Sequence, residues 1–248
     1  MCKSTMKDNE VRVRLFGIFE IENVHGKLTE VRYTSRGICW DMLKYLLANV
    51  ERIVPQEELS ERVHDESEKV TTEIVMRTRL SRTRDFLKPL QLDSNTDGLI
   101  VATKLKYGIN PKYEIHIDTD RFLALLREIR KMPLEDPQAL VLCNEALELY
   151  RGPFLQFVPN KWVKPYQETY KKEFLILAES ALARTKLLND YTALDMLIKR
   201  APVIVPEAEE FHKAMIAYLE EKQMAIEKMH YIDVLKIESN AEWANELV

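Results

Sequence analysis

Hydrophobic and polar positions alternate at the start of the chain. Val11, Val13 and Leu15 recur at every second residue, which predicts a half-buried strand in the first part of 11–22. The polar stretch 23–27 contains Gly26 and predicts a turn, and 28–33 is expected to return as a second strand. The chain is therefore expected to open with a pair of strands.

The next apolar positions follow helical spacing in three successive segments. The first helix is expected over 36–49 with Thr34 or Ser35 as N-cap, and the second opens at Pro55. The third is predicted over 71–87, where Pro89 follows. Two short strands, 99–103 and 105–109, come after it. A strand pair, three helices and a terminal hairpin occur in this order in a winged helix that carries an N-terminal sheet.

From residue 118 onward the pattern changes to helices of roughly 10 to 20 residues separated by prolines and short polar links. The expected helices cover 119–131, 137–150, 165–189, 191–200, 206–221 and 224–237. Such a series predicts stacked helical hairpins of the tetratricopeptide type, with an ordinary helical bundle as the alternative. The predicted fold class is mainly α with a small β component: a winged helix-turn-helix over 11–113, then an α-helical tetratricopeptide-like repeat domain over 118–248.

The third helix carries four arginines within eight residues, from Arg77 to Arg84. At about 100° per residue, Met76, Leu80, Thr83 and Leu87 share one face that is expected to point into the core. The opposite face is expected to carry Thr78, Ser81, Arg82 and Asp85, with Ile74 and Arg77 on its flank. Arginine can donate two bonds to a guanine edge or to a phosphate, and Ser and Thr can bond phosphate oxygens. This face therefore predicts insertion into a DNA major groove, and the alternative is a solvated basic face on an ordinary helix.

Lysines in the hairpin extend this candidate surface. Lys104 and Lys106 are expected at the turn between the two strands, where a wing grips a phosphate or the minor groove. Arg36 and Lys44 are further candidates for backbone phosphates, with a solvent-facing position as the alternative.

Charge is distributed unevenly along the chain. The formal net charge is −4, but residues 1–113 hold 19 Lys and Arg against 17 Asp and Glu, whereas residues 114–248 hold 17 against 23. A mildly basic first half and an acidic second half indicate two domains with different partners.

Other chemistries find little support in the sequence. The three cysteines lie far apart and form no CxxC pair, the five histidines are isolated, and glycine-rich phosphate loops and HExxH are absent. No apolar run reaches the roughly 18 residues that a membrane helix needs. We therefore expect a cytoplasmic, non-enzymatic protein with no metal, no cofactor and no membrane contact. An aromatic-rich stretch over 150–174 is expected to form helix core, or else a groove for a peptide or small ligand.

Several stretches, taken in order, resemble a known family. They are 13–19 at the opening strand, 54–59 at the second helix, 80–87 in the third helix, 99–107 in the hairpin, 118–122, and 146–155 with Trp162 following. The chain resembles the bacterial regulators that join an OmpR/PhoB-type winged helix to a bacterial transcriptional activator domain, the group that includes the Streptomyces antibiotic regulatory proteins. The likeness covers about residues 11–237.

The resemblance implies a sequence-specific DNA-binding transcription regulator, most often an activator. Its expected partners are double-stranded DNA, RNA polymerase and a second copy of the chain, since the helical domain would serve dimerisation or regulation. The residues expected to contact DNA are Arg77, Thr78, Ser81, Arg82, Arg84, Lys104 and Lys106. The alternative is a helical interaction module whose winged helix no longer binds DNA.

Overall fold

The computed structural model describes residues 6–30, 37–63, 73–239, 242–245 and 247. The chain divides into two compact units, which are described separately. Unit 1 contains residues 1–119 together with 155–164, and unit 2 contains residues 120–154 and 165–248. The first junction lies close to the expected end of the winged helix, whereas no sequence pattern predicted that 155–164 would join the first unit.

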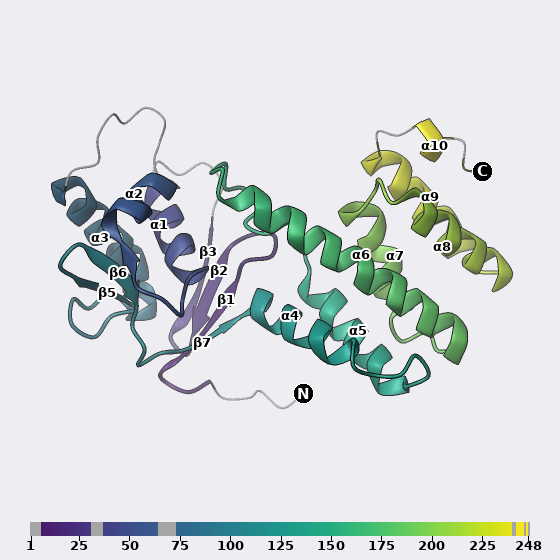
Figure 1. The fold of residues 1–248 in the computed structure, drawn as a ribbon, viewed down its shortest axis with the longest axis horizontal. Coiled ribbons are helices and arrows are strands. Elements are labelled where there is room, and N and C mark those ends of the chain that lie inside the picture. Colours follow the sequence, from purple (N-terminus) through teal and green to yellow (C-terminus); the bar gives the residue numbers. More distant parts are fainter. Residues whose placement is uncertain (1–5, 31–36, 64–72, 240–241, 246, 248) are drawn as a thin grey trace. The chain divides into compact units, whose positions relative to one another are not determined.

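Unit 1 contains a four-stranded sheet in the order β3-β2-β1-β7 (Figure 1). Its strands are β1 (Glu10–Arg14), β2 (Glu20–Asn23), β3 (Gly26–Thr29) and β7 (Glu114–Ile117). The first three are antiparallel neighbours, and β7 pairs parallel to β1. Val11 and Val13 are buried, as their alternation predicts.

The expected strand pair is therefore one part of a larger sheet. The stretch 11–22 holds two strands, because the chain turns between them at Gly17, whose φ of 79° suits glycine. The return strand covers Gly26–Thr29 rather than 28–33, and residues 31–33 lie outside the described residues. The short strand β7 was not predicted, because its four residues offer too little pattern to separate them from a loop.

The helices and hairpin of unit 1 follow the predicted order. They are α1 (Gly37–Leu47), α2 (Gln56–Arg62), α3 (Glu73–Leu87), the 3₁₀ turn η1 (Lys88–Leu90), β5 (Ile100–Thr103) and β6 (Lys106–Ile109). Pro55 is the N-cap of α2 and also forms the short strand β4 (Val54–Pro55), which extends the hairpin into a sheet of order β4-β6-β5. The proposed caps Thr34 and Ser35 and the expected start of the third helix at 71–72 lie outside the described residues.

Aromatic and polar contacts fix α3 against α1. The Trp40 ring stacks on Phe86 at 5.3 Å between centroids and meets Phe19 edge-on at 5.5 Å. Thr83, fully buried, places its Oγ1 2.8 Å from the Arg79 carbonyl oxygen and 3.3 Å from that of Cys39. These contacts hold the core side of α3 in place and so determine which side of the helix faces outward.

The sequence left two alternatives for Lys44, a contact with a DNA phosphate or a position in solvent. The structure shows neither. Its side chain is 1% exposed, and its Nζ lies 2.7 Å from Glu30 Oε1 and 3.4 Å from Asp41 Oδ1. The prediction that it contacts a DNA backbone is wrong, because a buried ammonium held by two carboxylates has no route to a phosphate. The other candidate, Arg36, lies outside the described residues.

Residues 155–164 pack as a strap within unit 1. The Leu155 amide donates to the Leu15 carbonyl at 2.7 Å, and Asn160 Nδ2 donates to the Arg62 carbonyl at 2.9 Å. The Trp162 ring meets Tyr45 edge-on with centroids 4.9 Å apart. The strap therefore binds the end of β1, the C-terminus of α2 and one side of α1.

The regular elements of unit 2 are helices, and its described residues form no β-strand. Its helices are α4 (Asp118–Ile129), α5 (Pro137–Leu149), α6 (Val163–Leu188), α7 (Leu194–Ile204), α8 (Glu209–Glu221), α9 (Ala225–Glu238) and α10 (Glu242–Asn245). α7 packs against both α5 and α9, and α8 packs against α9. This successive stacking confirms the helical-repeat fold. Pro202 was expected to separate helices but lies inside α7, within its last turn, where it leaves the Ile198 carbonyl without the hydrogen bond that a backbone N–H at this position would donate.

A buried arginine closes the end of α4. Arg184 of α6 is 4% exposed, and its guanidinium donates to the carbonyl oxygens of Ile129, Met132, Pro133 and Leu134. The last carbonyls of a helix lack partners within the helix and carry partial negative charge. Arg184 reaches one of them, that of Ile129, and three carbonyls of the turn that follows, so its positive charge lies at that end of the helix.

A buried histidine joins α8 to α9. His212 Nε2 lies 2.8 Å from the Val205 carbonyl oxygen, and His212 Nδ1 lies 2.6 Å from the Tyr231 hydroxyl. Because a carbonyl only accepts, Nε2 carries the proton and Nδ1 accepts from Tyr231, so the ring fits this site in its neutral form. Burial lowers the pKa of His212, in agreement with this arrangement.

Candidate nucleic-acid interface

The outward side of α3 is the surface that the sequence singled out. Met76, Leu80, Thr83 and Leu87 are buried, which confirms the predicted core face. Thr78, Ser81, Arg82 and Asp85 are exposed on the opposite side, together with Ile74 and Arg77. The helix therefore presents a continuous polar and cationic surface outside its core contacts.

Arg77 and Arg82 are the exposed arginines of this helix. Arg77 lies beside Glu73, one turn earlier, in an ion pair whose side chains are 74% and 50% exposed. Such a pair contributes roughly 0.2–1 kcal/mol, so a phosphate can compete for the guanidinium. Arg82 is exposed and has no ion pair with any other described residue.

The other two arginines are held by the fold. Arg79 is 5% exposed, and its Nη1 lies 3.9 Å from the Met76 sulfur, on the core side. Arg84 is half-buried, and its Nη2 donates to the Ile100 carbonyl at 3.0 Å while Nη1 donates to Asn95 Oδ1 at 2.5 Å. A phosphate contact by Arg84 would require these bonds to break. In the structure, Arg84 joins α3 to β5 and to the preceding loop.

The hairpin β5–β6 carries the two predicted lysines at its tip. Lys104 and Leu105 form the two-residue turn, with φ of 40° and 61°, and Lys106 begins β6. All three side chains are exposed. The Leu105 carbonyl accepts from the Gln56 amide at 2.8 Å, so the turn is fixed to the N-terminus of α2. The wing is therefore a short, anchored hairpin whose two lysine side chains are exposed to solvent.

The base of the wing lies close to the start of α3. Tyr107 of β6 is buried, and its hydroxyl donates to Gln56 Oε1 at 3.1 Å. Burial raises the pKa of Tyr107, and the nearby carboxylate of Glu73 raises it further, whereas Arg77 opposes the effect.

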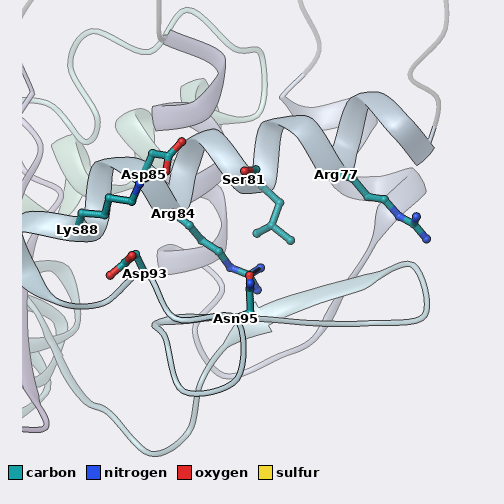
Figure 2. A pocket seen from close by; sticks show the side chains of 8 residues that line it. Arg77, Ser81, Arg84, Asp85, Lys88, Asp93 and Asn95 are labelled. Carbon is teal, nitrogen blue, oxygen red and sulfur yellow. Dashed lines mark hydrogen bonds and ion pairs between the residues drawn. The ribbon is translucent and has the colours of Figure 1, made fainter.

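A depression of about 400 Å³ lies along α3 toward the loop 91–98 (Figure 2). It is lined by Arg77, Leu80, Ser81, Arg84, Asp85, Lys88, Asp93 and Asn95. Figure 2 shows Arg84 directed toward Asn95, and Asp85 beside Lys88, whose Nζ is 2.6 Å from Asp85 Oδ1. The lining is mostly charged and of both signs, which favours a polar, charged partner over an apolar ligand.

The cysteines, the metal-ligating side chains and the apolar helices of the described residues complete the comparison with the sequence. Cys39 and Cys143 are buried free thiols, as expected of small core residues. His, Cys, Asp and Glu side chains form no group of three that would suit a metal ion in this part of the chain. Within the same part, no helix combines the length and apolar character needed to span a bilayer.

Four aromatic residues of the stretch 150–174 lie in the core of unit 2. Tyr150 lies 5.6 Å from Phe122 and 5.0 Å from Phe174, and Phe154 lies 5.4 Å from Tyr170, each measured between ring centroids. Tyr150, Phe154, Tyr170 and Phe174 are all buried. Core packing, the first of the two interpretations of this stretch, is therefore confirmed for these four residues, whereas Phe157 and Trp162 belong to the strap of unit 1 and Tyr166 is 41% exposed.

The contacts that hold the candidate surface together were not visible in the sequence. Asn95 and the Ile100 carbonyl, which bind Arg84, lie 11 and 16 residues beyond it. A loop asparagine and a backbone oxygen carry no pattern that would point to such a partner. The two positive-φ residues of the wing turn were hidden for the same reason, since neither is Gly or Asn.

Fold and surface together define a winged-helix unit joined to a helical-repeat unit. Residues 117–228 match the family model of the bacterial transcriptional activator domain. The match confirms the resemblance predicted from the sequence. No curated protein sequence matches the chain.

The fold of the chain is similar to a solved structure of Mycobacterium tuberculosis EmbR in complex with a low-affinity phosphopeptide. The TM-score is 0.64 and the sequence identity 16%, with 92% of this chain and 59% of that chain covered. At this identity the likeness establishes the fold, which is the predicted winged helix followed by a helical-repeat domain. The chain spans about three-fifths of the length of the EmbR chain that it matches.

Proposed function

We propose that this protein is a sequence-specific, double-stranded-DNA-binding transcription regulator, an activator, that acts in the cytoplasm without catalysis. The outward side of α3 enters the major groove, where Arg77, Thr78, Ser81 and Arg82 contact DNA. One observation carries the proposal: the arginine-bearing side of α3 is exposed while its apolar side is buried. A helix in this position matches the recognition helix of helix-turn-helix proteins.

The wing supplies the second contact. Lys104 and Lys106 are exposed at the tip of a hairpin whose turn is fixed to α2. Anchoring favours binding, because the backbone of the turn has little conformational entropy left to lose at the interface. Arg84 acts mainly by holding β5 and the loop 91–98 against α3, since its guanidinium is engaged in the fold. Its predicted phosphate contact is therefore secondary in this proposal.

Unit 2 supplies contacts to other proteins. The name of the matched family, bacterial transcriptional activator domain, supports a role in activating transcription. We assign to this unit the contacts with RNA polymerase and with a second copy of the chain. Light scattering across a concentration series, with and without operator DNA, tests the dimer directly.

The alternative function is an interaction module without DNA binding. The observation that favours it is the placement of acidic groups on the same surface: Glu73 pairs with Arg77, and Asp85 and Asp93 line the depression beside α3. These carboxylates would repel phosphates and attract a basic protein surface instead. The DNA-binding function requires that Arg82 and the wing lysines outweigh them.

Fluorescence anisotropy with duplexes enriched from a random-sequence pool distinguishes the two functions. Each phosphate neutralised by a cation contributes about −0.9 to the slope of log K against log salt, so removing one contact reduces the slope by about one unit. We expect this reduction for Arg82→Ala and for Lys104→Ala. Arg127→Ala, an exposed arginine of α4 in unit 2, is the matched control and is expected to leave the slope unchanged. Failure of the pool to enrich at low salt would reject DNA binding.

A further inference from the structure

The outward side of α3 is not uniformly cationic. At about 100° per residue, Ile74, Thr78, Ser81 and Asp85 fall within about 60° of one another, and they form a central stripe. Arg77 and Arg82 lie about 40° beyond its two edges. In its first two turns this stripe is uncharged, because Asp85 is its only charged member and lies near the C-terminal end.

Ile74 is the most unusual member of the stripe. Its side chain is 77% exposed in the first turn of α3, although a large aliphatic side chain favours burial. It has a small neighbour one turn further along, Thr78, whose hydroxyl donates to the Ile74 carbonyl at 3.0 Å. Because its one proton is used there, the Thr78 hydroxyl can only accept from a ligand. The start of the stripe therefore offers apolar surface and acceptors, but no donor for a guanine edge.

We infer that Ile74 reads a thymine through its C5-methyl group, in a site flanked by phosphate contacts from Arg77 and Arg82. This inference rests on the proposed DNA binding and deepens it. The major groove is the one surface of a duplex where a base presents a methyl group, and thymine alone carries it. The N-terminal residues of a recognition helix are those that contact base edges, which is where Ile74 lies.

Charge complementarity explains why DNA suits this surface better than an apolar protein partner does. An exposed isoleucine between two arginines fits a groove whose floor holds methyl groups and whose rims are anionic. A purely apolar partner would leave both guanidinium groups desolvated and without new partners, which is costly. Of the two partners that the sequence allows for the arginines, a guanine edge or a phosphate, this inference assigns the phosphate.

Removing a single methyl group from the DNA tests the inference. A duplex enriched from a random pool by the wild-type protein is prepared with one thymine at a time replaced by deoxyuridine, which keeps the pairing and removes only the methyl group. We expect one thymine per half-site at which the change weakens wild-type binding roughly fourfold, the effect of one buried methyl group. Ile74→Ala should bind thymine and deoxyuridine equally at that position.

Ile18→Ala is the matched control, since Ile18 is another exposed isoleucine of unit 1 and lies outside α3. It should keep the preference for thymine. Specific binding without any thymine preference, or a preference that survives in Ile74→Ala, would overturn the inference and leave the proposed function standing. Failure of the wild type to enrich any duplex would remove the proposed function, and the inference with it.

Discussion

Replacing Lys44 with Met tests how unit 1 holds a buried charge. Lys44 is 1% exposed, and its partners Glu30 and Asp41 are 16% and 15% exposed. Removing one member of a buried ion pair costs roughly 3–5 kcal/mol, because the remaining charge is left without compensation. Since both carboxylates keep some access to water, we expect a loss of about 3 kcal/mol for Lys44→Met at neutral pH.

Urea denaturation followed by tryptophan fluorescence measures this loss, because Trp40 and Trp162 both belong to unit 1. With a slope of about 2 kcal/mol per molar urea, the midpoint should fall by about 1.5 M. Lys112→Met is the matched control. Its lysine forms an exposed pair with Asp97 at 3.3 Å, and it should lose less than about 1 kcal/mol.

The loss should also depend on pH. Burial already raises the pKa of Asp41. Without the ammonium, the folded-state pKa of this carboxyl rises further above its unfolded value. The folded state of the variant then gains stability relative to the unfolded state as pH falls toward that raised pKa. The difference between Lys44→Met and wild type should therefore shrink from pH 7.5 to pH 5. Equal losses for Lys44→Met and the control, or a difference that grows on acidification, would refute the reasoning.

Three further predictions concern other parts of the fold. Arg184→Met should lower the free energy of unfolding of unit 2 by about 3 kcal/mol in urea titrations, because the last carbonyl of α4 and three carbonyls of the turn after it lose this donor, and Arg184→Lys should recover only part of the loss. Acid should destabilise unit 2, because the pKa of His212 is lower in the folded state than in the unfolded state. The stability that the neutral ring contributes is complete above about pH 6.5 and is lost as pH falls below that value. Thermal scans of His212→Asn should show a weaker pH dependence, and an equal one would count against this. Replacing Lys104 and Leu105 together by Asn-Gly should raise the free energy of unfolding of unit 1 by about 1 kcal/mol in urea titrations, because both positions have positive φ. An unchanged free energy of unfolding would contradict this prediction.

The periodicity of apolar residues predicted most of the helices and strands. The elements that it missed are the shortest ones. The predicted core face of α3 was correct at every position because 15 residues give the helical period enough repeats. The strands β4 and β7 have two and four residues, too few for a pattern, and only their pairing with β6 and β1 stabilises them. Short strands formed by distant partners cannot be recognised from local sequence.

Charge was predicted less well than apolar pattern. Lys44 and Arg79 look like surface cations in the sequence, yet both are buried. A long side chain can lie on either side of a helix, and its position depends on acidic or polar partners such as Glu30, which is 14 residues away. The apolar residues determine the orientation of α3, and whether each arginine is free follows only from the three-dimensional neighbours.

The central claim is that the outward side of α3 lies in the major groove. Ser81 is exposed in the middle of this side, whereas Cys39 and Cys143 are buried. An iron chelate attached to Ser81→Cys, in a chain with the native cysteines replaced, should cleave an enriched duplex within a few base pairs of the selected half-site. Free chelate at the same concentration should cut uniformly. A specific complex that forms with the chelate at position 81 and leaves the half-site uncut would contradict the claim.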